Sequence, residues 1–260
     1  MAARLPRDRA ARDREPGGGG LAVLRRLLHV AETGSTNDDV ATAARDGAGE
    51  GLWLRADVQN AGRGRLGRQW ISRLGNLHAS TLVRLRRGDP PAPSLALVSG
   101  VAMHEALDLF SPAPLTIKWP NDVLAGEAKL AGTLLERRED AVIVGIGANL
   151  AHAPELADRP ATSIAALAGA APEPATVLDA LAEAFERRLG EWRGAGLDAI
   201  IVEWRDRAHP IGTAITATPP DGVPITGLFD GLDEAGALRL RLADGRAHVI
   251  HAADILVHRS

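Results

Sequence analysis

Apolar and polar residues alternate along the chain in patterns that predict both strands and helices. Apolar character and flanking turn residues predict strands at 51–58, 77–85, 115–118, 129–136 and 141–145, and at the end of the apolar segment 21–30. Longer apolar stretches predict helices at 94–110 and at 175–207, the second broken near 194–196. A shorter helix should begin at Ser35 or Thr36 and run to about residue 45, since either side chain can cap its acidic first turn.

The two ends of the chain differ from its middle. Residues 1–20 carry five arginines, three acids and four consecutive glycines, a composition that predicts a disordered tail. Beyond residue 209, short strand-like runs alternate with turns rich in proline, glycine and aspartate, and residues 211–257 fit a small five-stranded barrel. We therefore predict a tail (1–20), a larger domain (21–209) and a C-terminal barrel (210–260).

Composition narrows the class of protein. The hydrophobic share of 45% is enough for a proper core, and no stretch approaches a membrane span. A net charge of -3 gives no attraction to nucleic acid or membrane. The chain has no cysteine, and its N-terminus lacks the apolar core of a secretory signal, so we expect a cytoplasmic protein.

Lysine and the side-chain amides are unevenly used. Only Lys118 and Lys129 stand among the 30 basic residues, and all seven Asn and Gln residues fall between positions 37 and 149. Arginine replaces lysine poorly where a compact ammonium group is needed, so both lysines are candidates for a site. For the amides, chance and turn usage remain an alternative.

The most distinctive segment lies in the long polar loop 59–76. It runs Gly62-Arg63-Gly64-Arg65-Leu66-Gly67-Arg68 and is followed by Trp70. Glycines let a backbone approach a ligand closely, arginines match carboxylate or phosphate oxygens, and tryptophan offers a flat apolar face. The alternatives are a flexible Arg/Gly-rich loop or a nonspecific RNA-binding patch.

Three further clusters carry candidate chemistry. Lys118-Trp119-Pro120-Asn121-Asp122 could hold an anion and position a nucleophile, or could be a charged turn. Lys129-Leu130-Ala131-Gly132 could neutralise charge on a transferring phosphoryl group, or could be an exposed strand. Gly145-Ile146-Gly147-Ala148-Asn149 could let a purine approach closely, or could be a simple turn.

Taken in order and spacing, these clusters resemble one known family. Together with Ser35-Thr36-Asn37 and Gln59-Asn60-Ala61, they are similar to the motifs of the biotin–protein ligases over about residues 28–165. The chain most resembles the monofunctional members without an N-terminal DNA-binding domain. The resemblance implies a mixed sheet flanked by helices, similar to class II aminoacyl-tRNA synthetases, within a catalytic domain at 21–209, followed by an SH3-like barrel.

The resemblance also implies an activity and roles for the residues. The expected reaction uses ATP and Mg²⁺ to convert biotin to biotinyl-5'-AMP and then biotinylates a lysine of a biotin carboxyl carrier protein. Residues expected to bind biotin are Ser35, Thr36, Asn37, Gln59, Gly62, Arg63, Gly64, Lys129 and Gly132. Residues expected to bind the nucleotide are Arg65, Arg68, Trp70, Lys118, Asn121 and Asn149, the last at the adenine. Arg65, Lys129 and Asp122 are the expected catalytic residues, with Asp122 assisting deprotonation of the carrier lysine.

Some features depart from the family pattern. Ile71-Ser72-Arg73 follows Trp70 where the family often has Ser-Pro, and a glycine common in the family's barrel is replaced within residues 252–255. Residues 151–174 carry no clear motif beyond Ala161-Thr162-Ser163. A lipoate–protein ligase and an RNA-binding module are the alternative functions, and His248 with His251 suggests, weakly, a zinc enzyme.

Overall fold

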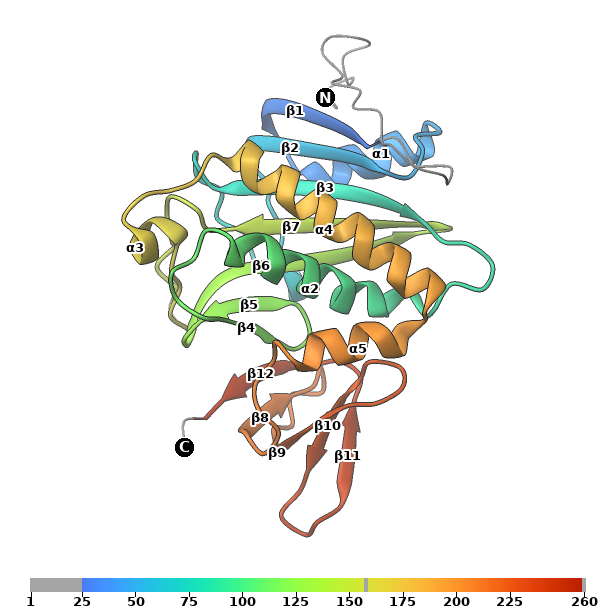
Figure 1. The fold of residues 1–260 in the computed structure, drawn as a ribbon, viewed down its shortest axis with the longest axis vertical. Coiled ribbons are helices and arrows are strands. Elements are labelled where there is room, and N and C mark those ends of the chain that lie inside the picture. Colours follow the sequence, from blue (N-terminus) through green and yellow to red (C-terminus); the bar gives the residue numbers. More distant parts are fainter. Residues whose placement is uncertain (1–24, 157–158, 259–260) are drawn as a thin grey trace.

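The structure of the protein is a computed structural model that describes residues 25–156 and 159–258. It has a larger α/β part and a smaller C-terminal β part, and the chain passes from one to the other after its last helix (Figure 1). The predicted disordered tail, residues 1–20, lies outside the described residues. In the described part, no helix has both the length and the apolar character that crossing a membrane requires.

A mixed sheet forms the centre of the larger part (Figure 1). Its strands are β1 (Arg26–Thr33), β2 (Leu52–Gln59), β3 (Leu77–Arg84), β4 (Leu115–Lys118), β5 (Asp122–Ala125), β6 (Ala128–Arg138) and β7 (Ala141–Ala148). They lie in the order β1-β2-β3-β7-β6-β5-β4. β1 and β2 are parallel and the other neighbouring pairs are antiparallel. The predicted mixed sheet is confirmed.

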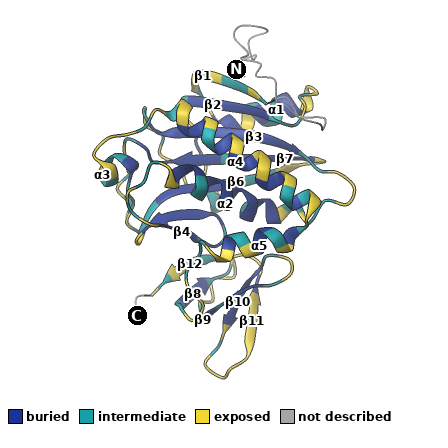
Figure 2. Ribbon diagram, viewed as in Figure 1, coloured by how far each residue is buried: buried dark blue, intermediate teal, exposed yellow. Residues whose placement is uncertain are grey.

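Helices cover both faces of this sheet. On one face lie α2 (Leu95–Asp108), α4 (Pro174–Gly194) and α5 (Leu197–Arg205), and α1 (Thr36–Arg45) lies on the other. Successive strand residues point to opposite faces, so neighbours on β2 join different clusters. Trp53 meets Phe185 of α4 edge to face at 5.6 Å, whereas Leu54 packs in the cluster around Val40 of α1. Burial on both faces explains the nearly continuous apolar strands (Figure 2).

The face of the sheet that α1 covers carries two glycines along β7. Ile143 packs in the α1 cluster, and Gly145 and Gly147 follow it at two-residue intervals, so they present the same face of the sheet. Because glycine has no side chain, Asn37 of α1 can lie directly over Gly145 and the Trp70 ring directly over Gly147. All four residues line the cavity described below.

The prediction differs from the structure in short elements. The sequence pattern predicts no strand at β5, which has only four residues and begins with an aspartate. β7 extends three residues past the predicted end at 145. The prediction ends too early because glycine often marks a turn, whereas Gly147 lies inside the strand and lines the cavity described below. Helix α3 (Ile164–Ala168) and the 3-10 turns η1 (Arg65–Gly67) and η2 (Ala92–Ser94) were also not predicted. Short elements carry too few periodic positions for a pattern to appear.

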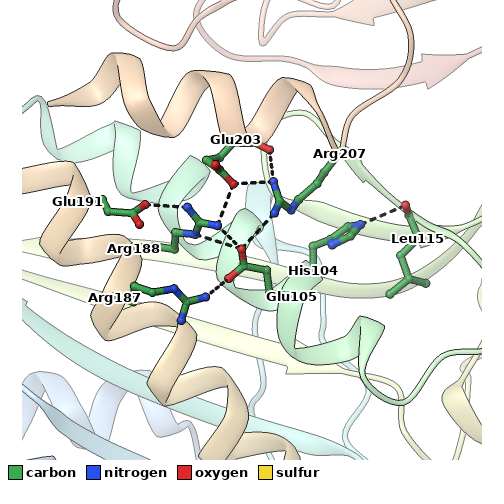
Figure 3. A network of polar contacts seen from close by, with 8 residues as sticks. All are labelled: His104, Glu105, Leu115, Arg187, Arg188, Glu191, Glu203 and Arg207. Carbon is green, nitrogen blue, oxygen red and sulfur yellow. Dashed lines mark hydrogen bonds and ion pairs between the residues drawn. The ribbon is translucent and has the colours of Figure 1, made fainter. Parts of the chain in front are cut away.

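A charged network joins the helices behind the sheet (Figure 3). Glu105 of α2 accepts hydrogen bonds from Arg188 of α4, with 3.1 Å between Nε and Oε1, and from Arg207 after α5, at 3.2 Å. Glu203 of α5 accepts from the same two arginines at 2.8 Å each. The Arg207 carbonyl in turn accepts from Ile117 N of β4 at 2.8 Å. The network therefore fixes the chain where it leaves the larger part.

Five antiparallel strands form the C-terminal part, as predicted. They are β8 (Ala214–Thr218), β9 (Ile225–Leu232), β10 (Leu238–Arg241), β11 (Ala247–Ile250) and β12 (Asp254–Val257). Their order is β11-β10-β9-β8-β12, so β11 and β12 are the edge strands. The turn of the β10–β11 hairpin and most of β11 are exposed (Figure 2), whereas the beginning of β12 faces the larger part.

Candidate active site

A cavity of about 510 Å³ lies on the glycine-bearing face of the sheet. It is lined by residues of α1, the 59–76 loop and β4 to β7, by residues 154, 156 and 159–161, and by β12. Every site residue predicted from the sequence lines this cavity except Gly62. The folded chain thus brings together motifs that are separated by up to 114 positions, from Ser35 to Asn149.

The loop over the cavity is a short hairpin, not an irregular segment. Trp70 N donates to the Gly62 carbonyl at 2.9 Å, and Gly64 N donates to the Arg68 carbonyl at 2.7 Å. Gly62 lies in the stem, where a β carbon would come within 2.8 Å of the Trp70 carbonyl oxygen. A side chain at position 62 would therefore open the stem. We call residues 62–70 the Gly/Arg loop.

Trp70 extends from this loop onto the floor of the cavity. Its ring lies so close to Gly147 that a β carbon there would come within 2.3 Å of Cε2 and Cζ2. Lys129 Nζ is 5.7 Å from the centre of the ring, within cation–π range. The Trp70 Nε1 atom is buried and has no hydrogen-bond partner among the described residues. The ring therefore closes the floor and leaves one donor for a ligand.

Basic side chains surround one carboxylate in the cavity. Asp122 Oδ1 is 2.6 Å from Lys129 Nζ, and Asp122 Oδ2 is 3.8 Å from both Lys118 Nζ and Arg159 Nη1. Gly132 leaves space for the closest pair, since a β carbon there would lie 2.9 Å from Lys129 Nζ. The pKa of Lys118 lies below its ordinary value because the side chain is buried, although the Asp122 carboxylate acts in the opposite direction. Three cations facing one carboxylate leave an excess of positive charge, which suits an anionic ligand.

Arg65 adds a fourth cation from the Gly/Arg loop. Its Nη1 donates to Asn121 Oδ1 at 3.2 Å, and its Nη2 donates to the Ala253 carbonyl at 3.5 Å. The pKa of Arg65 lies below its ordinary value because the side chain is buried, although the nearby Asp254 and Asp122 carboxylates act in the opposite direction. The loop thus holds a partly buried guanidinium beside the same group of charges.

The start of α1 supplies a neutral polar end to the cavity. Gln59 Oε1 accepts from Thr36 N and Oγ1, at 2.9 and 3.0 Å. Ser80 Oγ lies 2.7 Å from Thr36 Oγ1 and donates to Asn37 Oδ1 at 2.6 Å. Asn37 Nδ2 donates to Glu136 at 2.7 Å. These fixed donors and acceptors could orient a small polar ring.

Asn149 joins β7 to the 159–163 segment that runs beside β6. Its Nδ2 donates to the carbonyls of Thr162 (3.1 Å) and Lys129 (3.4 Å), and Lys129 N donates to the Pro160 carbonyl at 2.9 Å. The Asn149 Oδ1 atom is buried and has no hydrogen-bond partner among the described residues. The amide is therefore oriented with an acceptor available to a ligand that carries a donor.

Comparison with known proteins identifies the family. Residues 31–149 match the Biotin/lipoate A/B protein ligase family, and residues 211–257 match the Biotin protein ligase C terminal domain. The chain is 36% identical over 256 residues to the biotin–(acetyl-CoA-carboxylase) ligase of Mycobacterium tuberculosis, covering 96% of this chain and 94% of that protein. This chain belongs to the biotin protein ligase family.

Solved structures of biotin protein ligases have the same fold. The enzyme from Aquifex aeolicus, solved in complex with biotin and ATP, is 29% identical with a TM-score of 0.79, over 90% of this chain and 99% of that one. The enzyme from Leishmania major, solved with biotinyl-5-AMP, is 28% identical with a TM-score of 0.62, over 87% of this chain and 98% of that one. The predicted fold class and family are both confirmed.

The site of this family member includes residues that the sequence did not single out. Ser80 and Glu136 fix Thr36 and Asn37, yet each lies inside a predicted strand where nothing marks it. Arg159 faces Asp122, but as one of 28 arginines it carried no signal. Residues 160–162 lie against Lys129, and the sequence singles out Ala161 and Thr162 without giving them a role. Only the three-dimensional contacts identify Ser80, Glu136 and Arg159.

Proposed function

We propose that the protein uses ATP to convert biotin to biotinyl-5'-AMP and then transfers the biotinyl group to a lysine of a carrier protein. The observation that carries this proposal is the arrangement of one cavity, with a neutral polar end at Thr36 and a cationic end around Asp122. Biotin has the same division, since a polar ureido ring and a carboxylate stand at its two ends. The family and its biotin-bound relatives support the choice of substrate.

The polar end orients the ureido ring in this proposal. Ser35, Thr36 and Gln59 bond the ring, and the Gly/Arg loop closes over it through Arg63 and Gly64. Thr36 and Gln59 already hold each other at 2.9–3.0 Å, so the ligand meets pre-positioned groups. Asn37 stands behind them, fixed by Ser80 and Glu136. Groups fixed before binding lose little freedom when the ligand arrives.

The first chemical step joins biotin to AMP. A biotin carboxylate oxygen attacks the α-phosphorus of ATP, a P–O bond forms, and the bond to pyrophosphate breaks. Negative charge gathers at the phosphorus during this step, and nearby fixed cations stabilise it. Lys129 and Arg65 contact the reacting groups, with Lys118 and Arg68 beside the phosphates. Asn149 Oδ1 accepts from the adenine amino group, and Trp70 shields the adenylate from water.

The second step moves the biotinyl group to the carrier. The amine nitrogen of the carrier lysine bonds to the acyl carbon, and the bond between that carbon and AMP breaks. Asp122 accepts the proton that the lysine ammonium must lose before attack. Asn121 holds Arg65 beside this centre at 3.2 Å, so the phosphate of the leaving AMP stays neutralised.

Magnesium accompanies the nucleotide in this proposal. No group of three or more His, Cys, Asp or Glu residues in the described ranges could hold a metal ion, and His248 and His251 are exposed. Asp122, Glu127 and Asp254 nevertheless line the cavity, and Mg²⁺ commonly binds one or two carboxylates together with substrate phosphates. Mg²⁺ bound to ATP would supply further charge neutralisation.

The carrier in this proposal is a biotin carboxyl carrier protein or domain. The cytoplasmic location stays a prediction.

Mass spectrometry of the product tests the proposed function. Purified protein is incubated with ATP, Mg²⁺ and either biotin or lipoate, and both pyrophosphate and the acyl-adenylate are measured. We expect biotinyl-5'-AMP with biotin and none without ATP, and an Arg65→Ala variant should form it far more slowly. Lipoyl-adenylate alone would change the substrate, and no adenylate from either acid would refute the ligase activity.

A further inference from the structure

Two arginines of the Gly/Arg loop reach the first residues of β12 in the C-terminal part. Arg65 Nη2 donates to the Ala253 carbonyl at 3.5 Å, and Arg68 forms an ion pair with the Asp254 carboxylate. Asp254 is the first residue of β12, an edge strand. Of the two acceptors, only the Asp254 carboxylate is charged, so its hydrogen bond is the stronger type.

The hairpin transmits this contact to the rest of the loop. Gly64 N donates to the Arg68 carbonyl at 2.7 Å, Arg68 N donates to the Arg65 carbonyl at 3.2 Å, and the stem closes between Trp70 and Gly62 at 2.9 Å. Arg65 and Arg68 therefore move as one unit. A group that holds the Arg68 side chain also fixes the position from which Arg65 reaches Asn121.

The tip of the hairpin has little other support. None of the residues of η1 is buried, and the side chain at its middle position, Leu66, is 66% exposed. Leu66 also has a φ of 57°, a left-handed conformation that L side chains rarely adopt. No apolar burial thus holds the tip down, and polar contacts to the C-terminal part and to Asn121 must do so.

We propose that Asp254 is a positioning residue that latches the Gly/Arg loop over the cavity through its ion pair with Arg68. This inference rests on the proposed function, because the latch acts by retaining the acyl-adenylate beneath the loop. It gives the C-terminal part a defined role, since its edge strand supplies the carboxylate. It also explains how Arg65 can stay beside Asn121 while the loop tip is exposed.

Loss of the latch has two measurable consequences. The Asp254→Asn variant should be cut by trypsin after the loop arginines about fivefold faster, and should release biotinyl-adenylate about fivefold faster. This magnitude corresponds to about 1 kcal/mol, the upper range for a half-exposed ion pair. The side chains of Arg68 and Asp254 are 40% and 38% exposed. Asp254→Glu keeps the charge and should restore most of both properties.

Matched variants separate the latch from general damage to the C-terminal part. Asp230→Asn breaks the Arg239–Asp230 pair in the same part, at 2.8 Å, and should leave loop cleavage and adenylate release unchanged. Exchanging the partners, with Arg68→Asp and Asp254→Arg together, should restore protection of the peptide bond after Arg65, a trypsin site that every variant keeps. If Asp254→Asn lowers the melting temperature, Arg68→Gln breaks the same pair from the loop side, and cleavage after Arg65 is again compared with the wild type.

Two results would overturn the latch. Cleavage after Arg65 at the wild-type rate in folded Asp254→Asn and Arg68→Gln would do so, and so would equal acceleration by Asp230→Asn. The trypsin measurement needs no substrate, so it tests the latch even if the wild-type protein forms no biotinyl-adenylate. That second failure would refute the proposed function separately.

Discussion

The Nζ atom of Lys129 lies 2.6 Å from the Oδ1 atom of Asp122, and both side chains are mostly buried. The two residues come from adjacent strands, β5 and β6, and Gly132 provides the space in which they meet. Because Lys118 and Arg159 also approach Asp122, removal of Lys129 would not leave the carboxylate without a cation. The pair can therefore be changed without an unpaired charge inside the fold.

Lys129→Ala should lower the rate of biotinyl-adenylate formation by about 10²–10³-fold, the usual effect of removing one fixed donor from a developing charge. The melting temperature should change little, because Lys118 and Arg159 remain near Asp122. Single-turnover formation of the adenylate is the measurement. A fully active, folded variant would remove Lys129 from the catalytic residues.

Gly147→Ala should displace Trp70 from the cavity floor, since the added β carbon would lie 2.3 Å from its ring. Overpacking of this kind costs about 1–3 kcal/mol, so adenylate formation should fall about tenfold. Gly190→Ala in α4 is the control, because nothing lies within 4 Å of a β carbon there. Equal activity of the two variants would show that the Trp70 contact is dispensable.

Ser80→Ala should weaken biotin binding about tenfold. The Ser80 hydroxyl joins Thr36 Oγ1 (2.7 Å) and donates to Asn37 Oδ1 (2.6 Å). Its loss leaves the buried Asn37 Oδ1 atom without its donor, which costs about 1–3 kcal/mol, while Thr36 Oγ1 keeps its bond to Gln59. Ser99→Ala is the matched control, since Ser99 is equally buried but bonds only to carbonyls of its own helix. Calorimetric titration with biotin distinguishes the two.

The free energy of unfolding should decrease as the pH is lowered, because His78 is buried in its neutral form. Burial lowers the pKa of His78 to about 4, whereas the unfolded chain takes up the proton near pH 6.5. Between these values the unfolded state binds more protons, so the free energy of unfolding decreases as pH falls, by about 2 kcal/mol at pH 5. Urea unfolding at pH 7.5 and pH 5 should show a smaller decrease for His78→Asn. The same decrease in both proteins would assign the effect to other groups.

Glu105→Gln should destabilise the fold without altering the cavity. Glu105 accepts from Arg187, Arg188 and Arg207, and loss of its charge leaves three guanidinium groups facing a neutral amide (Figure 3). Breaking a mostly buried ion pair costs about 3 kcal/mol, and the side chains of Arg188 and Glu105 are 9% and 17% exposed. Asp140→Asn, which breaks an exposed pair, should cost less than about 1 kcal/mol. Urea unfolding compares the two, and unchanged biotin affinity in Glu105→Gln would place its effect on the fold.

The sequence by itself determined the main elements, the family and the principal cluster residues. Apolar periodicity defined the long strands and helices, because burial of one or both faces fixes which positions must be apolar. The scarcity of lysine indicates Lys118 and Lys129 as candidates, because arginine replaces lysine poorly where a compact ammonium group is needed. Residues that act together within a short segment are neighbours in the sequence, so such motifs can be recognised without the structure.

Only the tertiary structure decided which distant side chains share a site. Ser80, Glu136 and Arg159 became visible through contacts that span from 37 to 99 positions, such as Arg159 with Asp122 and Asn37 with Glu136. The role of Asp254 depends on the C-terminal part folding back against a loop 186 positions earlier. Such pairings follow from strand order and packing of the whole chain, and no local pattern of residues encodes them.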